Sequence, residues 1–337
     1  MSMSTLPGAR SVAAIEVSVV IPVFNEERNI ETLHTRLSPV MVALGKTYEI
    51  ILVDDGSRDR SIELLRALAA RDPAVVVVEL ARNYGQHAAV FAGFERARGA
   101  VVVTLDADLQ NPPEEIPKLL AKIAEGYDVV GGWRQQRHDS LLRTLPSKLV
   151  NKFTSRVTGC NLKDYGCMLR AYRLTIVERM LLHREISSFI PALATVVGGK
   201  IVEIPVEHSE RYAGVSQYNL WRLIKLNYDL VTGFSVLPLQ ALSFIGFLMS
   251  VLGIGFGAFL GVRRLIVGPE VEGVFTLFAI LFFFVGSLYM ALGILGEYVG
   301  RIYQEVRGRP RYIVSRVVGP GAAGANLSSR GSGSASA

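Results

Sequence analysis

The chain has 337 residues, half of them hydrophobic, with a formal net charge of +6 and a mean hydropathy of +0.33. This length allows one large domain and an additional module, and two cysteines, Cys160 and Cys167, are too few for a disulfide framework or a structural zinc site. The positive charge would suit nucleic acid, but no nucleic-acid-binding motif accompanies it, so we expect no nucleic-acid partner.

After a flexible N-terminus (1–15), short β-rich runs alternate with amphipathic helices. The predicted strands are 17–23, 48–54, 75–80, 100–105, 128–131 and 200–206, with helices over 27–44 and from about 59, 86 and 113. Continuous apolar strands that alternate with helices are typical of a mostly parallel sheet covered on both faces. We therefore predict an α/β domain over residues 16–212, with ligands beyond the carboxyl ends of its strands.

Two long stretches without charge follow this domain. No Asp, Glu, Lys or Arg occurs from Leu230 to Val262 or from Gly273 to Gly296. Each stretch exceeds the roughly 20 residues that cross a bilayer core, so we predict transmembrane helices at 236–262 and 273–296. The alternative is two buried helices of a large soluble core, but such helices usually carry charge on an exposed face.

Basic residues flank these predicted spans on their outer sides. Arg222 and Lys225 precede the first span, and a basic tail (297–318) follows the second. This distribution predicts that both ends of the chain are cytoplasmic, as does the lack of an apolar secretory signal at the N-terminus. The aromatic and basic segment 213–233 is predicted to lie in the membrane interface or to pack on the α/β domain. The Gly/Ser-rich end (319–337) is predicted to be disordered.

Acidic residues follow the ends of two predicted strands. Asp54, in the run VDDGS, has a carboxylate that can accept hydrogen bonds from a base or a ribose, although the run also suits an ordinary turn. Asp106 and Asp108 leave the fourth strand, and Gln110 follows them. Divalent cations bind carboxylates, waters and substrate phosphates, so we interpret this pair as a metal site that neutralises a leaving diphosphate. Solvated turn aspartates are the alternative.

The common glycine-rich phosphate loops are missing from the sequence. It contains neither GxxxxGK[ST] nor GxGxxG at a first strand–helix turn, which favours a nucleotide held through a metal ion. The five histidines form no HExxH cluster, and His87 is interpreted as structural.

The runs SVVIPVFNEE, LVDDGS, RNYGQH, TLDADLQNPPEEIP and DYGCMLRAYR occur in this order. Together they resemble the family 2, GT-A fold glycosyltransferases that use polyprenyl-phosphate acceptors, from about Val17 to Val318. The resemblance implies a UDP-sugar donor, undecaprenyl phosphate as acceptor, Mg²⁺ or Mn²⁺, and inversion at the anomeric carbon. It also implies a homotetramer in the bacterial inner membrane. Two of the runs, NYGQH and DYGCMLRAYR, favour members that transfer an aminoarabinose-type sugar in lipid A modification and polymyxin resistance.

The resemblance also implies roles for individual residues. The residues expected to line the uridine pocket are Pro22, Asn25, Glu26 and Asp54. Asp106 and Asp108 are expected to meet the cation and the donor diphosphate beside Gln110. The arginines expected to face the donor and acceptor phosphates are Arg134, Arg137 and Arg211, and planar guanidinium groups suit phosphate. Asp108 and Asp164 are the catalytic candidates, and Asp164 has the position often assigned to a base, although it can instead orient the acceptor or help to hold the metal.

One departure from the family pattern is Gln217, where a lysine is common, so a positive charge near the phosphates is absent. Three other functions were weighed. A processive polysaccharide synthase would carry a QxxRW motif and more spans, and no QxxRW occurs here. A sister transferase of glucose or mannose is the second. A membrane-tethered sugar-nucleotide binder without activity is the third, and the intact acidic pair argues against it.

Overall fold

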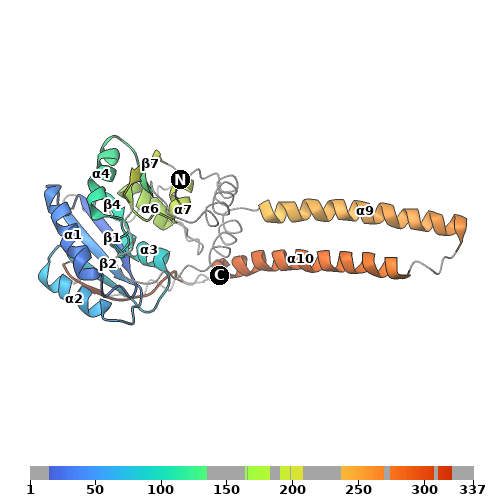
Figure 1. Cartoon of the computed structure of the whole chain (residues 1–337), viewed down its shortest axis with the longest axis horizontal. Coiled ribbons are helices and arrows are strands. Elements are labelled where there is room, and N and C mark those ends of the chain that lie inside the picture. The colour runs from blue at the N-terminus through green and yellow to red at the C-terminus, as the bar shows by residue number, and fades with distance from the viewer. Residues whose placement is uncertain are drawn as a thin grey trace, which may run out of the picture. The chain divides into compact units, whose positions relative to one another are not determined.

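The computed structural model describes residues 15–134, 164, 166–182, 190–197, 199–207, 237–268, 274–306 and 310–320. The chain divides into two units. The sheet unit comprises Met1–Leu141, Leu162–Gln217 and Pro310–Ala337, and the helical unit comprises Leu142–Asn161 and Tyr218–Arg309. Figure 1 labels the helices of both units and several strands of the sheet. The predicted interfacial segment 213–233, and almost all of the two predicted termini, lie outside the described residues.

The sheet unit contains an eight-stranded sheet in the order β7-β5-β6-β4-β1-β2-β3-β8. Its strands are β1 (Val17–Val23), β2 (Tyr48–Asp54), β3 (Val75–Leu80), β4 (Val101–Thr104), β5 (Val129–Arg134), β6 (Arg170–Arg173), β7 (Ile201–Val206) and β8 (Val314–Val318). Strands β4, β1, β2 and β3 are parallel neighbours, and so are β5 and β7. Strand β6 is antiparallel to β4 and β5, and β8 is antiparallel to β3. The predicted mostly parallel sheet is therefore confirmed.

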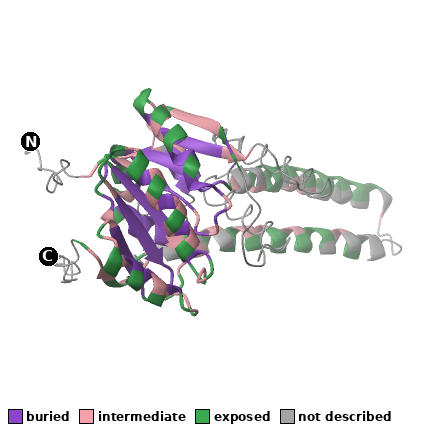
Figure 2. Ribbon diagram, turned by 60° about the vertical axis from the view of Figure 1, so that its left-hand side comes forward, coloured by how far each residue is buried: buried purple, intermediate pink, exposed green. Residues whose placement is uncertain are grey.

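Helices cover both faces of this sheet (Figures 1 and 2). Alternate residues of β1 point to opposite faces, so Ile21 joins one buried cluster and Val20 the other. The first cluster includes residues of α1 (Ile30–Ala43), α2 (Ser61–Arg71) and α4 (Ile116–Ala124), and the second those of α3 (Gln86–Arg96), α6 (Leu174–Leu182) and α7 (Ile190–Val196). Burial on both faces explains why these strands are continuous apolar runs.

The last strand, β8, differs from the sequence prediction of a basic tail over 297–318. Helix α10 continues through the first part of that range to Val306, and Val314–Val318 then pairs with β3, with Val317 opposite Val78. Val317 packs against the second buried cluster. The five residues VSRVV are short and have no clear alternation of apolar and polar residues, and the partner that makes this segment a strand lies more than 200 residues away.

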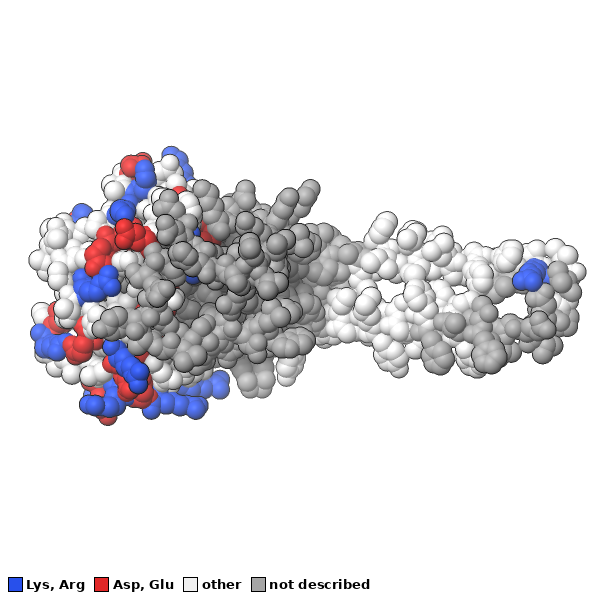
Figure 3. Space-filling model, in the orientation of Figure 1, with Lys and Arg blue, Asp and Glu red and all other residues white. Residues whose placement is uncertain are grey.

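The helical unit contains two long helices, α9 (Leu237–Val267) and α10 (Val274–Val306), of 31 and 33 residues. Their described surface carries large exposed apolar side chains, such as Phe247, Phe259 and Leu288, and almost no charge (Figure 3). Among the described residues, one window, Phe283–Gly300 in α10, is long and apolar enough to cross a membrane, and α9 has a shorter apolar stretch, Leu242–Gly253. Of the two expected transmembrane helices, only α10 has such a window among the described residues.

Candidate functional site

The topology brings most of the predicted site residues to one edge of the sheet. The carboxyl ends of β1, β2, β3 and β4 share an edge because these strands are parallel neighbours. Strand β5 runs in the same direction as β4, since both are antiparallel to β6. Because β6 runs in the opposite direction, its first residue and the segment just before it lie at this same edge. Loops at the carboxyl edge of an α/β sheet are where such folds bind ligands.

The loops after β1 and β2 are joined to each other by Asn25. Its backbone N–H donates to Ser57 Oγ at 3.0 Å, and its side-chain Oδ1 accepts from the backbone N–H of Arg58 at 2.8 Å. Asn25 has φ of 57°, a left-handed conformation that asparagine tolerates better than most residues. The side chain therefore fixes the shape of this edge, whatever else it contacts.

Two more of the predicted uridine-pocket residues lie beside Asn25. Pro22 is half-buried in β1 opposite Val53 of β2. Glu26 begins the approach to α1, where its Oε2 accepts from Asn29 Nδ2 at 2.5 Å and its backbone N–H donates to Ser61 Oγ at 2.9 Å. Pro22 and Glu26 therefore belong to the segments that bring the ends of β1 and β2 together.

Asp54 and Asp55 end β2 as neighbouring buried carboxylates, and burial raises the pKa of both. Asp54 accepts hydrogen bonds from the backbone N–H of Ser57 at 3.3 Å. Asp55, which the sequence analysis did not single out, accepts from the backbone N–H groups of Tyr84 and Gly85 at 2.7 and 2.9 Å. Asp55 therefore ties the end of β2 to the loop that leads from β3 into α3.

The predicted metal pair follows β4 directly, and both of its carboxylates are half-buried. Asp106 Oδ1 accepts from Gln86 Nε2 at 2.6 Å, and Asp108 Oδ1 accepts from the backbone N–H of Gln110 at 3.1 Å. The described residues contain no group of three or more His, Cys, Asp or Glu side chains arranged to hold a metal ion. Two carboxylates fit a Mg²⁺ or Mn²⁺ ion that takes its remaining ligands from water and phosphate.

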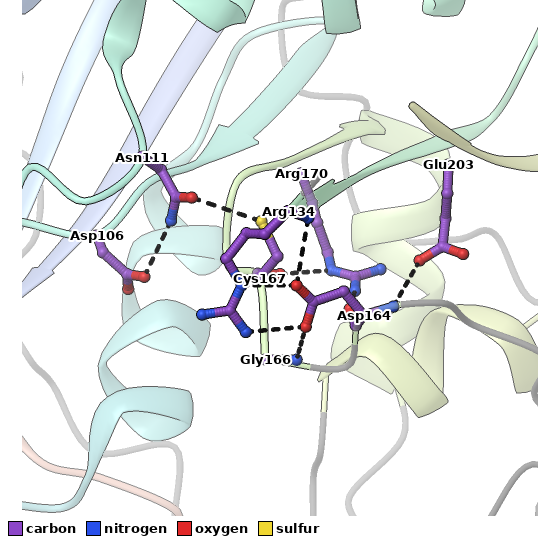
Figure 4. Close-up of polar contacts among 8 residues, drawn as sticks. All are labelled: Asp106, Asn111, Arg134, Asp164, Gly166, Cys167, Arg170 and Glu203. Atoms are coloured by element: carbon purple, nitrogen blue, oxygen red, sulfur yellow. Dashed lines mark hydrogen bonds and ion pairs between the residues drawn. The ribbon is translucent and has the colours of Figure 1, made fainter. Parts of the chain in front are cut away.

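Arg134 and Asp164 form a two-pronged ion pair at the end of β5 (Figure 4). Arg134 Nε and Nη2 donate to the two carboxylate oxygens of Asp164 at 2.6 and 3.0 Å. The carboxylate also accepts from the backbone N–H of Gly166 at 3.0 Å, and the carbonyl oxygen of Asp164 accepts from the buried Arg170 at 2.7 Å. The sequence analysis gave Arg134 and Asp164 separate roles, whereas the structure makes them partners.

This pairing follows from the register of the sheet. Gly131 of β5 lies opposite Arg170 of β6, so the residues just beyond these two positions meet at the same edge. A Cβ atom on Gly131 would lie 3.0 Å from Arg170 Nη1, and one on Gly166 would lie 3.0 Å from Arg134 Nη2. Glycine at both positions leaves room for the two guanidinium groups.

A second set of buried groups connects the acidic pair to Asp164. Asn111 lies between Asp106 and Cys167 (Figure 4): its Nδ2 donates to Asp106 Oδ2 at 3.5 Å, and its Oδ1 accepts from Cys167 Sγ at 3.7 Å. Burial, with the nearby Asp164 carboxylate, raises the pKa of the Cys167 thiol to about 11, so the sulfur keeps its proton at neutral pH. The sequence analysis assigned no role in the site to Asn111 or Cys167.

His87, next to Gln86 at the start of α3, is held neutral. Burial lowers the pKa of its imidazole to about 4, so it carries no charge at neutral pH, in agreement with the structural role predicted for it. Arg137, Arg211 and Gln217 lie outside the described residues. Their expected contacts with phosphate stay predictions.

Carboxylates and amides gathered at the carboxyl edge of an α/β sheet are typical of an enzyme active site. The family model "Glycosyl transferase family 2" matches residues 18–181. The chain belongs to this family, and it is a glycosyltransferase.

Several relatives have been named for a particular transfer. The undecaprenyl-phosphate 4-deoxy-4-formamido-L-arabinose transferase of Edwardsiella ictaluri (strain 93-146) is 52% identical over 305 residues, which are 90% of this chain and 94% of that protein. The protein of the same name from Shewanella sediminis (strain HAW-EB3) is 52% identical over 316 residues, 93% of this chain and 96% of that one. A solved structure, glucosyl-3-phosphoglycerate synthase from Mycobacterium tuberculosis, is 21% identical and covers 66% of this chain and 79% of its own, with a TM-score of 0.46.

Proposed function

We propose that this protein transfers 4-deoxy-4-formamido-L-arabinose from a UDP-sugar to undecaprenyl phosphate at the cytoplasmic face of the bacterial inner membrane. The observation that carries the proposal is the extent of its likeness to transferases named for this reaction. Their 52% identity extends over 90% of the chain, well beyond the family match at residues 18–181. A resemblance limited to nucleotide binding would be confined to the sheet unit.

The donor end of the site is assigned to the residues after β4. Asp106 and Asp108 would hold a Mg²⁺ or Mn²⁺ ion, which would supply positive charge for the departing nucleotide diphosphate. The loops after β1 and β2, with Pro22, Asn25, Glu26 and Asp54, lie at the same edge and form the wall for the base and the ribose. Their mutual hydrogen bonds make this wall rigid before the nucleotide binds.

The acceptor end is assigned to Arg134, held by Asp164. A phosphate monoester has its second pKa near 6, so the acceptor oxygen is already largely ionised at neutral pH and needs no strong base. Both carboxylate oxygens of Asp164 are engaged by Arg134. We therefore assign Asp164 to orienting Arg134 toward a phosphate, and the reaction to a single inverting displacement.

The helical unit supports an acceptor that stays in the bilayer. Helix α10 contains a window long and apolar enough to cross a membrane, and α9 exposes a second apolar surface. Large exposed apolar surfaces are rare on soluble monomers. We infer that both helices cross the membrane and that the chain acts as an oligomer, a tetramer by its resemblance to the family.

The test is incubation of the purified protein and Mn²⁺ with undecaprenyl phosphate and separate UDP-sugars, followed by mass spectrometry of the lipid. Product with the formamido-arabinose donor supports the assignment. Product with UDP-glucose alone would overturn the donor sugar and keep the class. Hydrolysis of the donor without lipid product would overturn the proposed acceptor. No turnover of any donor would overturn the proposed activity.

A further inference from the structure

The carboxylate of Asp106 is held by side chains from two separate parts of the sheet unit. Gln86, the first residue of α3, donates from Nε2 to Oδ1 at 2.6 Å, and Asn111 donates from Nδ2 to Oδ2 at 3.5 Å. Asp108 instead accepts from a backbone N–H within its own turn. The two members of the acidic pair are therefore supported in different ways.

Gln86 is held in place by the loop that precedes it. The backbone N–H groups of Tyr84 and Gly85 both donate to the buried carboxylate of Asp55. Gly85 has φ of 94°, which a residue with a side chain rarely adopts, so glycine allows the chain to turn there into α3. Further back, the N–H of Ala81 donates to the carbonyl of Ile313 at 2.9 Å. The loop that leads into α3 is thus held at two points.

Asn111 is oriented by its other neighbour. Its side chain is buried, and its Oδ1 accepts from Cys167 Sγ, so its Nδ2 is the group that faces Asp106. A reversed amide would place two acceptors against each other at Asp106 and lose the contact with the thiol. The orientation of this amide is therefore set by its environment.

The chemistry of these two donors suits a carboxylate that also binds a cation. Each carboxylate oxygen can accept more than one hydrogen bond, so an amide contact does not by itself prevent that oxygen from binding a metal ion. An amide is uncharged, whereas lysine or arginine at the same place would repel the cation. Partners that orient a metal ligand are worth roughly 10–100-fold in metal affinity when removed.

We propose that Gln86 and Asn111 are positioning residues that hold the Asp106 carboxylate in the orientation that binds the donor's divalent cation. This inference rests on the proposed metal role of Asp106. It assigns Gln86, at the start of α3, to the same cation as the acidic pair after β4. It also explains why Asp55, which is remote from the acidic pair in sequence, contributes to the site.

The experiment measures Mn²⁺ binding directly, from the electron paramagnetic resonance signal of free Mn²⁺, with the full-length protein in detergent and saturating UDP. Gln86→Ala is the main variant, because Gln86 is exposed and alanine suits the first turn of a helix. Asn83→Ala is the matched control: Asn83 is exposed in the same loop. Asn111→Leu is the second variant, with its folding checked by thermal denaturation.

Gln86→Ala is expected to raise the Kd for Mn²⁺ by roughly 10–100-fold, with Asn83→Ala unchanged and with turnover restored at high Mn²⁺. If Gln86→Ala binds Mn²⁺ as the wild type does, while Asp106→Ala does not bind, the positioning role is wrong and the metal site stands. If Asp106→Ala binds Mn²⁺ normally, the metal assignment under the proposed function is wrong as well. Loss of turnover in Gln86→Ala that no Mn²⁺ concentration restores would also contradict the positioning role.

Discussion

At the scale of single residues, the pairing of Arg134 with Asp164 favours an orienting role for the carboxylate over the role of a base. Both of its oxygens accept from the guanidinium, and the side chain of Asp164 is 5% exposed. Asp164→Asn replaces one acceptor with a donor and removes the charge, so Arg134 loses its orientation. A charged hydrogen bond is worth about 1.5–3 kcal/mol, so we expect kcat to fall by roughly ten- to a hundredfold. The pH–rate profile should keep its shape; the loss of one limb would support a base instead.

The acidic pair supports a second prediction at this scale. Asp108→Ala removes one of the two carboxylates that leave β4, and metal stabilisation of a leaving group is worth several kcal/mol. We expect lipid product to fall at least a hundredfold, in a protein that remains folded and in the membrane. A normal rate in this variant, measured by mass spectrometry of the lipid, would place the chemistry elsewhere in the chain.

Cys167 gives a third prediction, about stability rather than turnover. Its folded-state pKa is raised from 9.0 to about 11 by burial, so folding favours the protonated thiol. This contribution is fully present below pH 9 and is lost as the pH rises toward 11, by about 2–3 kcal/mol from a shift of two units. The Tm of the wild type, measured by thermal denaturation, should therefore fall more between pH 8 and pH 11 than the Tm of Cys167→Ala. Parallel curves would show that the thiol does not contribute.

At the scale of elements, the sheet was predictable wherever a strand is a continuous apolar run. Strands β1, β2 and β3 match their predicted bounds, because burial on both faces favours a nearly continuous run of apolar residues. Strands β6 and β8 were missed because each is short and becomes a strand through a distant partner. The same reason hides the contacts of Asp106: Gln86 is 20 residues away in sequence, and Cys167 is 56 residues from Asn111. Strand ends located the site, but tertiary contacts determine which side chains meet there.

The packing of strand β8 can be tested by replacing two of its residues, one at a time, with aspartate. Val317 is half-buried against the second core cluster and Ser315 is exposed, both on this strand. Val317→Asp places a charge against apolar side chains, and we expect it to cost about 2 kcal/mol or more, lowering Tm by several degrees. Ser315→Asp should change Tm little. Equal effects would mean that β8 does not pack as described.

At the scale of the whole molecule, the arrangement of α9 and α10 in the chain places constraints on where its active site can be. If both helices cross the bilayer, the residues before α9 and after α10 lie on one side, and the sheet unit draws segments from both sides of the pair, including β8. The basic residues outside the two helices favour the cytoplasm for that side, where basic residues would also favour an anionic lipid phosphate. The short connection between the helices then faces the opposite side.

A membrane-impermeant maleimide tests this orientation in spheroplasts of a cysteine-free variant. Glu270→Cys, in the connection between α9 and α10, should be labelled in intact spheroplasts, because the proposed topology places this connection on their outer side. Asn83→Cys, exposed in the sheet unit, should be labelled after permeabilisation and not before. The reverse pattern would place the sheet unit outside the cell, and labelling of both positions only after permeabilisation would show that the helix pair does not cross the membrane. Either result would contradict the proposal that the helix pair holds the site at the cytoplasmic face of the membrane, where it would meet undecaprenyl phosphate.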